Sequence, residues 1–333
     1  MQAIPLVRAS SLRPFFEFVT NGGGQLHGLR DRIGPVFREA GGLVPVAYGG
    51  LLIEEAARAT GLDDLGLRIG RSVVIDGFGE WGALIARSAT VGAFLQAALA
   101  SYRTFNTGYR LWVAARGDEA WLHLAYCRAL RAGRAHVLDY SLLTWLAAFR
   151  AMLGPTWRPR EIHLEGEPPR HAGEIAALAT QRLRYRQPTM ALGFPRATLA
   201  RRVEGVRPVP APAAGEPAPP ADFVGSVHRT VSALLQLGAA ELHVAAEAAG
   251  MSERSFQRRL GAQGLTFSDV LEAARFEAAR RMLADPAVRV IDVSTELGYS
   301  DSANFTRAFR RWTGVPPRTF RRTAARAPAP ASG

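Results

Sequence analysis

The stretch VIDVSTELGYSDSANFTRAFRRWTGVPPRTF, residues 290–320, decides the fold of the second half of the chain. Its first part predicts a short helix, because Val293 and Leu297 lie four residues apart and therefore on one face. Gly298 ends that helix, since the left-handed conformation at a helix end penalises a Cβ. A second helix follows, for which three neighbouring residues offer an N-cap oxygen: Ser300, Asp301 and Ser302.

The second helix has an apolar side and a polar side. Phe305, Phe309 and Trp312 fall at positions i, i+4 and i+7 and form one apolar stripe. The other side suits a DNA major groove, because Arg reads guanine and Asn reads adenine through paired hydrogen bonds. Taken alone, an arginine face is more often simply solvated, so both interpretations stay open at this point. The candidate DNA contacts on this helix are Ser302, Ala303, Asn304, Thr306, Arg307, Arg310 and Arg311.

The same pattern occurs a second time upstream, in VAAEAAGMSERSFQRRLGAQGLTF, residues 244–267. The two copies match in the glycine (Gly250 and Gly298), the following serine (Ser252 and Ser300), and the apolar stripe (Phe256 and Phe305, Leu260 and Phe309). Two tandem copies of one unit are difficult to explain as chance, and they favour a pair of helix-turn-helix units. The candidate DNA contacts in the first copy are Arg254, Ser255, Gln257 and Arg258.

At these residues the chain closely resembles the AraC/XylS family of bacterial transcription regulators. The resemblance covers residues 223–322 and rests on GMSERSFQRRL, GLTF, ARFEAARRML and LGYSDSANFTRAFRRWTGVPP. It implies contact with two successive major grooves of double-stranded promoter DNA, and RNA polymerase as a partner, usually in activation. Two positions depart from the family pattern: Ser294, where Ala is more usual, and Pro316, where Ser or Thr is usual. Both changes are conservative.

Composition sets wider limits. A chain of 333 residues has room for about two domains, each with its own core. The net charge of +12 is weak evidence for a nucleic-acid partner, because residues 222–333 carry only 15 Arg against 11 Asp and Glu. Cys127 is the single cysteine, which fits a reducing compartment. With neither a signal-peptide pattern nor a long apolar run, we expect a cytoplasmic protein without membrane contact.

The first half mixes helix and strand signals and predicts an α+β domain. Residues 109–117 and 119–127 alternate as strands around Gly117-Asp118, a hairpin signal. Helices are expected over 26–40, from Val46 to Gly61, over 92–106, 137–153 and 174–182, and a further strand over 160–164. Residues 41–203 resemble the effector-binding domain of the ornithine-utilisation-regulator branch of the family. They do not resemble the cupin-type sugar-binding half of the arabinose regulator.

This domain shows no pattern typical of an enzyme or a metal site. Residues 77–82 spell G-x-G-x-x-G, but the acidic residue that a dinucleotide site needs about 20 positions later is missing. The seven histidines are scattered, and no catalytic group is evident, so we expect no enzyme activity, no metal and no cofactor. Aromatic residues are dense and most should fill the core. Those chosen as candidate lining of an effector pocket are Tyr102, Asn106, Tyr109 and Trp145.

The predicted organisation is therefore an effector-binding and dimerisation domain (1–206), a proline-rich linker (207–221), a DNA-binding domain (222–322) and a disordered tail (323–333). The second domain should be all-α, with two helix-turn-helix units joined by one long helix that begins near Ser268 and stops at Pro286. The expected function is a homodimeric, effector-responsive transcription activator. The alternative is a helical protein–protein interaction module that does not bind DNA.

Overall fold

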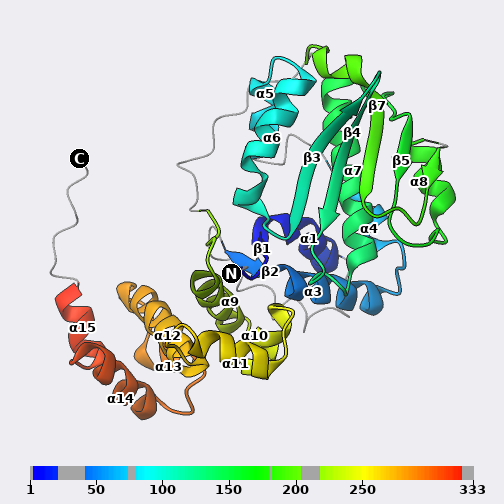
Figure 1. Cartoon of the computed structure of the whole chain (residues 1–333). Helices are drawn as coiled ribbons and strands as arrows, with labels where there is room; N and C mark the ends of the chain where they lie inside the picture. Colours follow the sequence, from blue (N-terminus) through cyan, green and yellow to red (C-terminus); the bar gives the residue numbers. More distant parts are fainter. Residues whose placement is uncertain (1–2, 22–41, 74–79, 181, 204–217, 325–333) are drawn as a thin grey trace. The chain divides into compact units, whose positions relative to one another are not determined.

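The computed structural model describes residues 3–21, 42–73, 80–180, 182–203 and 218–324, which form two compact units. Among the described residues, one unit contains Ala3, Ile4 and the chain from Pro220 onward, and the other contains the described residues between Pro5 and Pro219 (Figure 1). The first is all helical and the second contains helices and sheets, so the predicted fold class is confirmed. The helix expected over 26–40 lies outside the described residues, and so does most of the G-x-G-x-x-G stretch.

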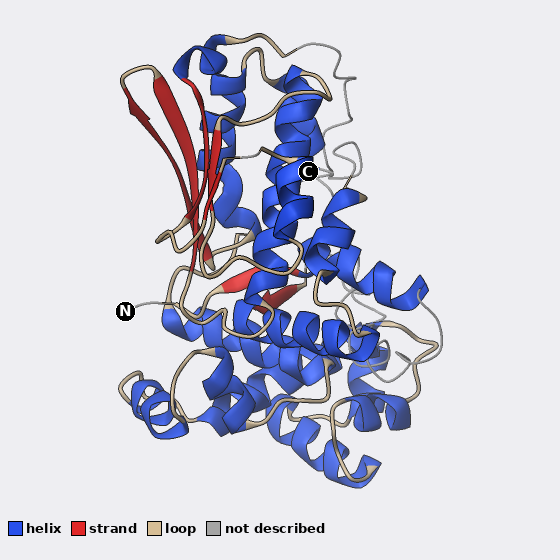
Figure 2. Cartoon of the chain, turned by 90° about the vertical axis from the view of Figure 1, so that its right-hand side faces the viewer, coloured by secondary structure: helices blue, strands red, loops and turns tan. Residues whose placement is uncertain are grey.

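The larger sheet of the N-terminal unit has five strands in the order β3-β4-β7-β5-β6. Neighbouring strands are antiparallel except for β5 and β6. The strands are β3 Tyr109–Arg116, β4 Glu119–Tyr126, β5 Glu161–His163, β6 Leu183–Arg184 and β7 Met190–Pro195. The predicted hairpin is confirmed, with Arg116 opposite Glu119 and Gly117 at a φ of 59°. Within the N-terminal unit, helices pack against one face of this sheet (Figure 2).

Around this sheet lie one small sheet and several helices. The small sheet pairs β1 Leu6–Arg8 with β2 Leu43–Pro45. The helices are η1 Ala9–Leu12, α1 Arg13–Asn21, α3 Val46–Thr60, α4 Leu65–Arg71, α5 Glu80–Arg87, α6 Val91–Phe105, α7 Arg134–Leu153, α8 Ala172–Leu178 and η4 Arg196–Ala200. The helix predicted over 174–182 therefore starts and ends earlier than expected. The core between α6, α7 and the sheet is apolar and contains the fully buried Phe94, Phe149 and Phe194.

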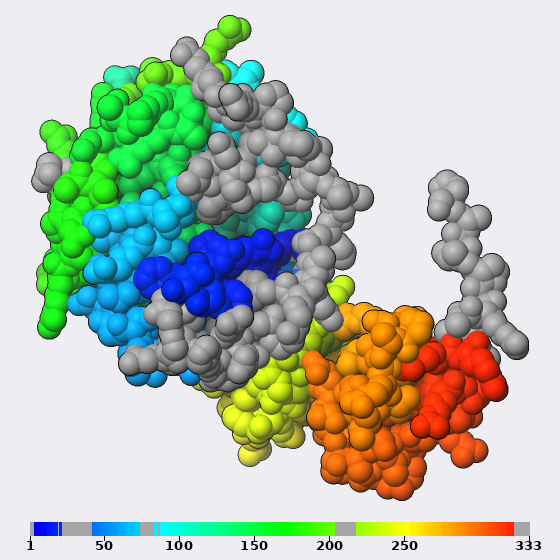
Figure 3. Space-filling model, turned by 180° about the vertical axis from the view of Figure 1, so that it is seen from behind, coloured from blue at the N-terminus to red at the C-terminus, as the bar shows by residue number. Residues whose placement is uncertain are grey.

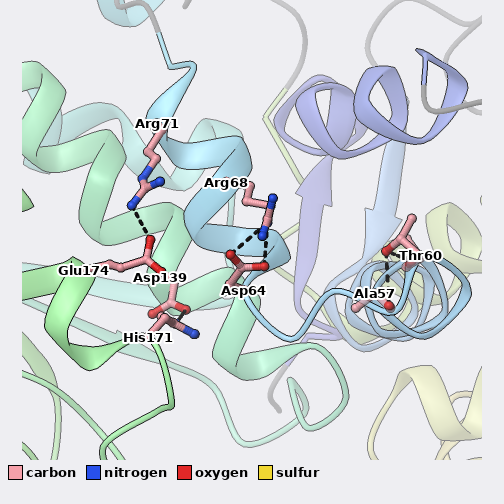
Figure 4. Close-up of polar contacts among 9 residues, drawn as sticks. Ala57, Thr60, Asp64, Arg68, Arg71, Asp139, His171 and Glu174 are labelled. Atoms are coloured by element: carbon pink, nitrogen blue, oxygen red, sulfur yellow. Dashed lines mark hydrogen bonds and ion pairs between the residues drawn. The ribbon is translucent and has the colours of Figure 1, made fainter.

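Helices α4 and α7 approach each other closely because α4 carries glycines on the contact side. A Cβ on Gly66 would lie 2.0 Å from the backbone oxygen of His136, and one on Gly70 would lie 2.8 Å from the Cβ of Leu143. The helices are also tied by polar contacts on their flank (Figure 4). Arg71 donates to Glu174 of α8 at 2.5 Å, and His171 lies 2.8 Å from the buried Asp139 of α7. These contacts hold α4, α7 and α8 together.

The C-terminal unit consists of α9 Phe223–Gln236, α10 Leu242–Ala248, α11 Glu253–Gly261, α12 Phe267–Ala284, α13 Val290–Glu296, α14 Ser302–Thr313 and α15 Pro317–Ala324. Gly250 and Gly298 sit after the first helix of each unit with φ values of 66° and 74°, as the sequence predicts. The long helix α12 is capped by Thr266 and not by Ser268: the Thr266 side chain accepts from the amide of Asp269, whose carboxylate accepts in return. From α12 to α15 the surface is continuous, orange to red in Figure 3.

Candidate nucleic-acid interface

The first helix-turn-helix unit is α10, the turn at Gly250, and α11. Ser252 caps α11 by accepting from the backbone amide of Ser255 at 3.3 Å. Phe256 and Leu260 are fully buried, and the Phe256 ring meets Phe223 of α9 edge-on at 6.0 Å. The polar side of α11 therefore points away from α9, because the packed side of α11 is fixed by these two anchors.

Three long polar side chains leave α11 on its solvent side. Arg254, Gln257 and Arg258 are exposed, and within the described residues none of them makes a hydrogen bond or an ion pair. Ser255 is half-buried beside them. Arg259 is different: its guanidinium lies 3.8 Å from the centroid of the Phe223 ring, a cation–π contact on the packed side. The predicted candidates on this helix thus share one exposed side.

The second unit is α13, the turn at Gly298, and α14. The N-cap of α14 is Asp301, which accepts from the amide of Asn304 at 2.6 Å. This hydrogen bond is the main reason that the pKa of Asp301 lies below its ordinary value. Asp301 is therefore the structural equivalent of Ser252, one residue later than the Ser252–Ser300 match in the sequence alignment. Phe305 and Phe309 are fully buried and anchor the helix.

The outward side of α14 carries the same classes of side chain, but several of them are paired with other side chains of the C-terminal unit. Asn304 donates to Ser300 Oγ at 2.9 Å and to Asp301 Oδ2 at 2.6 Å. Arg307 donates to Asn304 Oδ1. Arg311 donates to Glu272 Oε1 of α12 at 2.5 Å. Of the predicted candidates, Ser302, Ala303, Arg307, Arg310 and Arg311 are exposed, and Asn304 and Thr306 are half-buried.

Helix α12 connects both units and contacts the second through one face. Arg275 donates to the backbone oxygen of Leu297 at 3.1 Å, and its guanidinium lies 5.0 Å from the Tyr299 ring. Phe276 packs against Phe309 and Trp312, with ring centroids 6.2 and 5.7 Å apart. Arg275 therefore makes intramolecular contacts. At about 1.5 Å per residue, its 18 residues give a length of about 27 Å.

The candidate effector residues of the N-terminal unit come together only in part. Tyr102 and Tyr109 stack at 5.2 Å, and Tyr109 lies 5.4 Å from Tyr126. Trp145 is buried in the core, 6.2 Å from the Phe94 ring. The side-chain oxygen of Asn106 accepts from the amide of Gly108 at 2.7 Å, so this residue shapes the turn before β3.

Tyr126 was not among the candidates, although its position opposite Tyr109 on the neighbouring strand was a usable signal. Its hydroxyl lies 3.0 Å from Ser141 Oγ. Burial raises the pKa of Tyr126 to about 12, and it also raises the pKa of Tyr109. Both phenols therefore stay protonated at neutral pH and can donate a hydrogen bond.

The described part of the chain contains neither a candidate metal site nor a membrane-spanning helix. No group of three or more His, Cys, Asp or Glu side chains is arranged to hold a metal ion there. Every helix in the described ranges is too short or too polar to span a bilayer.

Two family models match the chain. A model described as "Helix-turn-helix domain" covers residues 245–323. A second, described as "Arabinose-binding domain of AraC transcription regulator, N-term", covers residues 37–203, which is half of the chain. The described strands of this unit form an open sheet. The word arabinose in the description of the family model does not identify the ligand of this chain.

The chain is also similar to individual proteins. The chain is 26% identical over 271 residues to the ornithine utilization regulator of Pseudomonas aeruginosa, a match that covers 77% of this chain and 78% of that protein. It is 42% identical over 81 residues to the transcriptional activator NphR of a Rhodococcus species, covering 24% of each chain. Among solved structures, the transcriptional regulator CdpR from Pseudomonas aeruginosa matches at 20% identity and a TM-score of 0.35, over 77% of this chain and 86% of CdpR.

Proposed function

The chain belongs to the AraC family of transcription regulators, and we propose that its two helix-turn-helix units bind two successive major grooves of promoter DNA. It is a DNA-binding regulator with an effector-binding domain, and it is not an enzyme. The observation that carries the proposal is the pair of recognition helices, α11 and α14, mounted on the uninterrupted helix α12. A strut of about 27 Å plus the width of the two units is compatible with the roughly 34 Å of one DNA turn.

The position of each candidate residue on its helix suggests whether it would contact a base or a phosphate. On α11, Arg254, Gln257 and Arg258 are available for base edges, with Ser255 beside them. On α14, Asn304 and Arg307 lie where bases would be read, whereas Ser302, Ala303 and Thr306 shape the surface. Arg310 lies in the last turn of α14, which suits a phosphate contact, whereas Arg311 of the same turn is paired with Glu272 of α12.

The N-terminal unit is proposed as the sensor of a small molecule. Tyr102 and Tyr109, with Tyr126 and Ser141, combine stacked rings with neutral hydroxyl donors, as ligand pockets often do. Trp145 and Asn106 support the surrounding structure. We keep 1–206, 207–221, 222–322 and 323–333 as the proposed domain limits, with the unit boundary at Pro219–Pro220 as support for the linker.

The proposal extends to the oligomeric state, the partner protein and the location of this regulator. The protein would act as a homodimer, would recruit RNA polymerase as an activator, and would work in the cytoplasm, where promoter DNA is found. NphR, which is similar to this chain over 81 residues, is described as a transcriptional activator, and this supports activation as the proposed effect on transcription.

The deciding experiment is a footprint of the purified full chain on its own upstream DNA, titrated against random competitor across a range of salt. Protection of two adjacent major grooves with a large specificity ratio is the expected result. Weak binding that disappears with modest salt and leaves no footprint would favour the protein-interaction alternative. Repeating the titration with candidate effectors tests the sensor role, because an unchanged affinity and an unchanged promoter output with every candidate would count against it.

A further inference from the structure

Recognition helices α11 and α14 differ in how many of their donors are free. Arg254, Gln257 and Arg258 of α11 have no partner within the described residues. On α14, Arg307 is bound to Asn304, and Arg311 is bound to a residue of another helix, Glu272 of α12. A carboxylate thus pairs with an arginine of α14, whereas Arg254 and Arg258 of α11 have no carboxylate partner within the described residues.

Glu272 engages α14 with both oxygens. Its Oε1 accepts from Arg311 at 2.5 Å, and its Oε2 accepts from the indole nitrogen of Trp312 at 3.3 Å. Trp312 also packs on Phe276, one turn further along α12. Glu272 and Phe276 therefore fix the C-terminal end of α14 against the strut through one polar and one apolar contact.

The Glu272–Arg311 pair is open to solvent, with 46% and 62% of the two side chains exposed. Such an exposed pair contributes little to stability. Its charge matters more for DNA, because an arginine that is neutralised by a carboxylate does not displace a counterion from a phosphate.

We propose that Glu272 is a specificity-determining positioning residue, which withholds Arg311 from the DNA backbone and so suppresses binding to unrelated sequences. The inference rests on the proposed DNA-binding function of the two units. Base readers such as Arg258 gain in relative weight, because the sequence-independent part of the affinity is reduced.

Glu272→Gln in the full chain tests this directly. Glutamine keeps the size and an acceptor oxygen for Trp312 but removes the charge. On random-sequence DNA we expect the affinity to rise about three- to ten-fold, and the plot of log K against log salt to steepen by about 0.9, the slope of one added phosphate contact. Affinity for the protein's own site should rise less, so that the specificity ratio falls.

The matched control is Glu277→Gln on the same helix. Glu277 is paired with Arg280 at 3.2 Å and is similarly exposed, so the variant changes the net charge by the same amount. It should leave the specificity ratio and the salt slope unchanged. An equal gain in both variants would show that only the net charge matters and would overturn the proposal.

The double variant Glu272→Gln with Arg311→Ala separates the mechanism from simple repulsion. If Glu272 acts by holding Arg311, the Glu272 change has no further effect on the salt slope once Arg311 is gone. A slope change that persists without Arg311 contradicts the proposal. A Glu272→Gln variant that loses affinity equally on all DNA and melts earlier would mark a merely structural residue. If the wild type itself leaves no footprint, the proposed function fails first, independently of this comparison.

Discussion

Arg258 and Arg307 occupy equivalent outward positions on α11 and α14, two residues after the buried Phe256 and Phe305. The sequence predicted this placement, because helical spacing from a buried aromatic fixes the direction of its neighbours. It could not predict which donors are free. The Arg311–Glu272 contact joins residues far apart in the chain, and Asn304 turns back to its own N-cap.

We expect Arg258→Ala and Arg307→Ala each to cost about 1–3 kcal/mol in binding to the protein's own site. Each should also relax base preference locally, because a bidentate reader of guanine is lost. Binding to a library of sites with single substitutions measures both effects. Uniform weakening across the library would instead identify a phosphate contact.

A second residue-scale prediction concerns pH. Burial and the neighbouring His163 lower the pKa of His123, and burial lowers that of His136. Below the ordinary value of 6.5 the unfolded chain therefore binds more protons than the folded one. The contribution of His123 and His136 to the free energy of unfolding is therefore complete above pH 6.5, and it is lost as the pH falls below that value.

Thermal melts of the full chain between pH 7.5 and about 6 measure this effect, and His123→Gln should flatten the profile. A melting temperature of the wild type that stays constant over this range would contradict the prediction.

At the scale of elements, the C-terminal helices could be predicted because local signals mark their ends: caps, glycine turns and apolar stripes. Strand β7 could not be predicted from the sequence. Its six residues are nearly all buried, an apolar run without alternation, and it contains Gly193, where a Cβ would lie 2.7 Å from the Trp121 ring. Strands β1 and β2 have only three residues each and were missed for the same lack of pattern.

Phe305→Ala should unfold the second helix-turn-helix unit. Phe305 is fully buried and contacts Tyr299 and Phe309 with ring centroids 5.6 and 5.7 Å apart, so its truncation should cost about 3–5 kcal/mol. Circular dichroism should record a partial loss of helix, and a footprint should shrink to one groove. Phe256→Ala is the matched change in the first unit and should remove the other groove. Full retention of both grooves in either variant would contradict the anchoring role.

At the scale of the molecule, the chain combines a sensor unit and a DNA-binding unit, and the family is supported by a model that covers half of the sequence. The sequence predicted this division from the proline-rich segment, because such a composition cannot form a core. The effector site stays a prediction. Among its four candidates the rings of Tyr102 and Tyr109 stack, and packing against residues far away in sequence decides which rings gather.

Helix α12 contains neither glycine nor proline, and this has a consequence for the DNA that the protein selects. A rigid connector fixes not only the distance between two half-sites but also their rotational phase around the duplex. Inserting about five base pairs between the half-sites turns one of them to the far side, because a helical turn takes about 10–10.5 base pairs. Gel-shift titrations should then show the affinity of a single half-site, and insertion of a full turn should not restore tight binding. The operator's spacing is therefore as much a part of the recognition code as its bases.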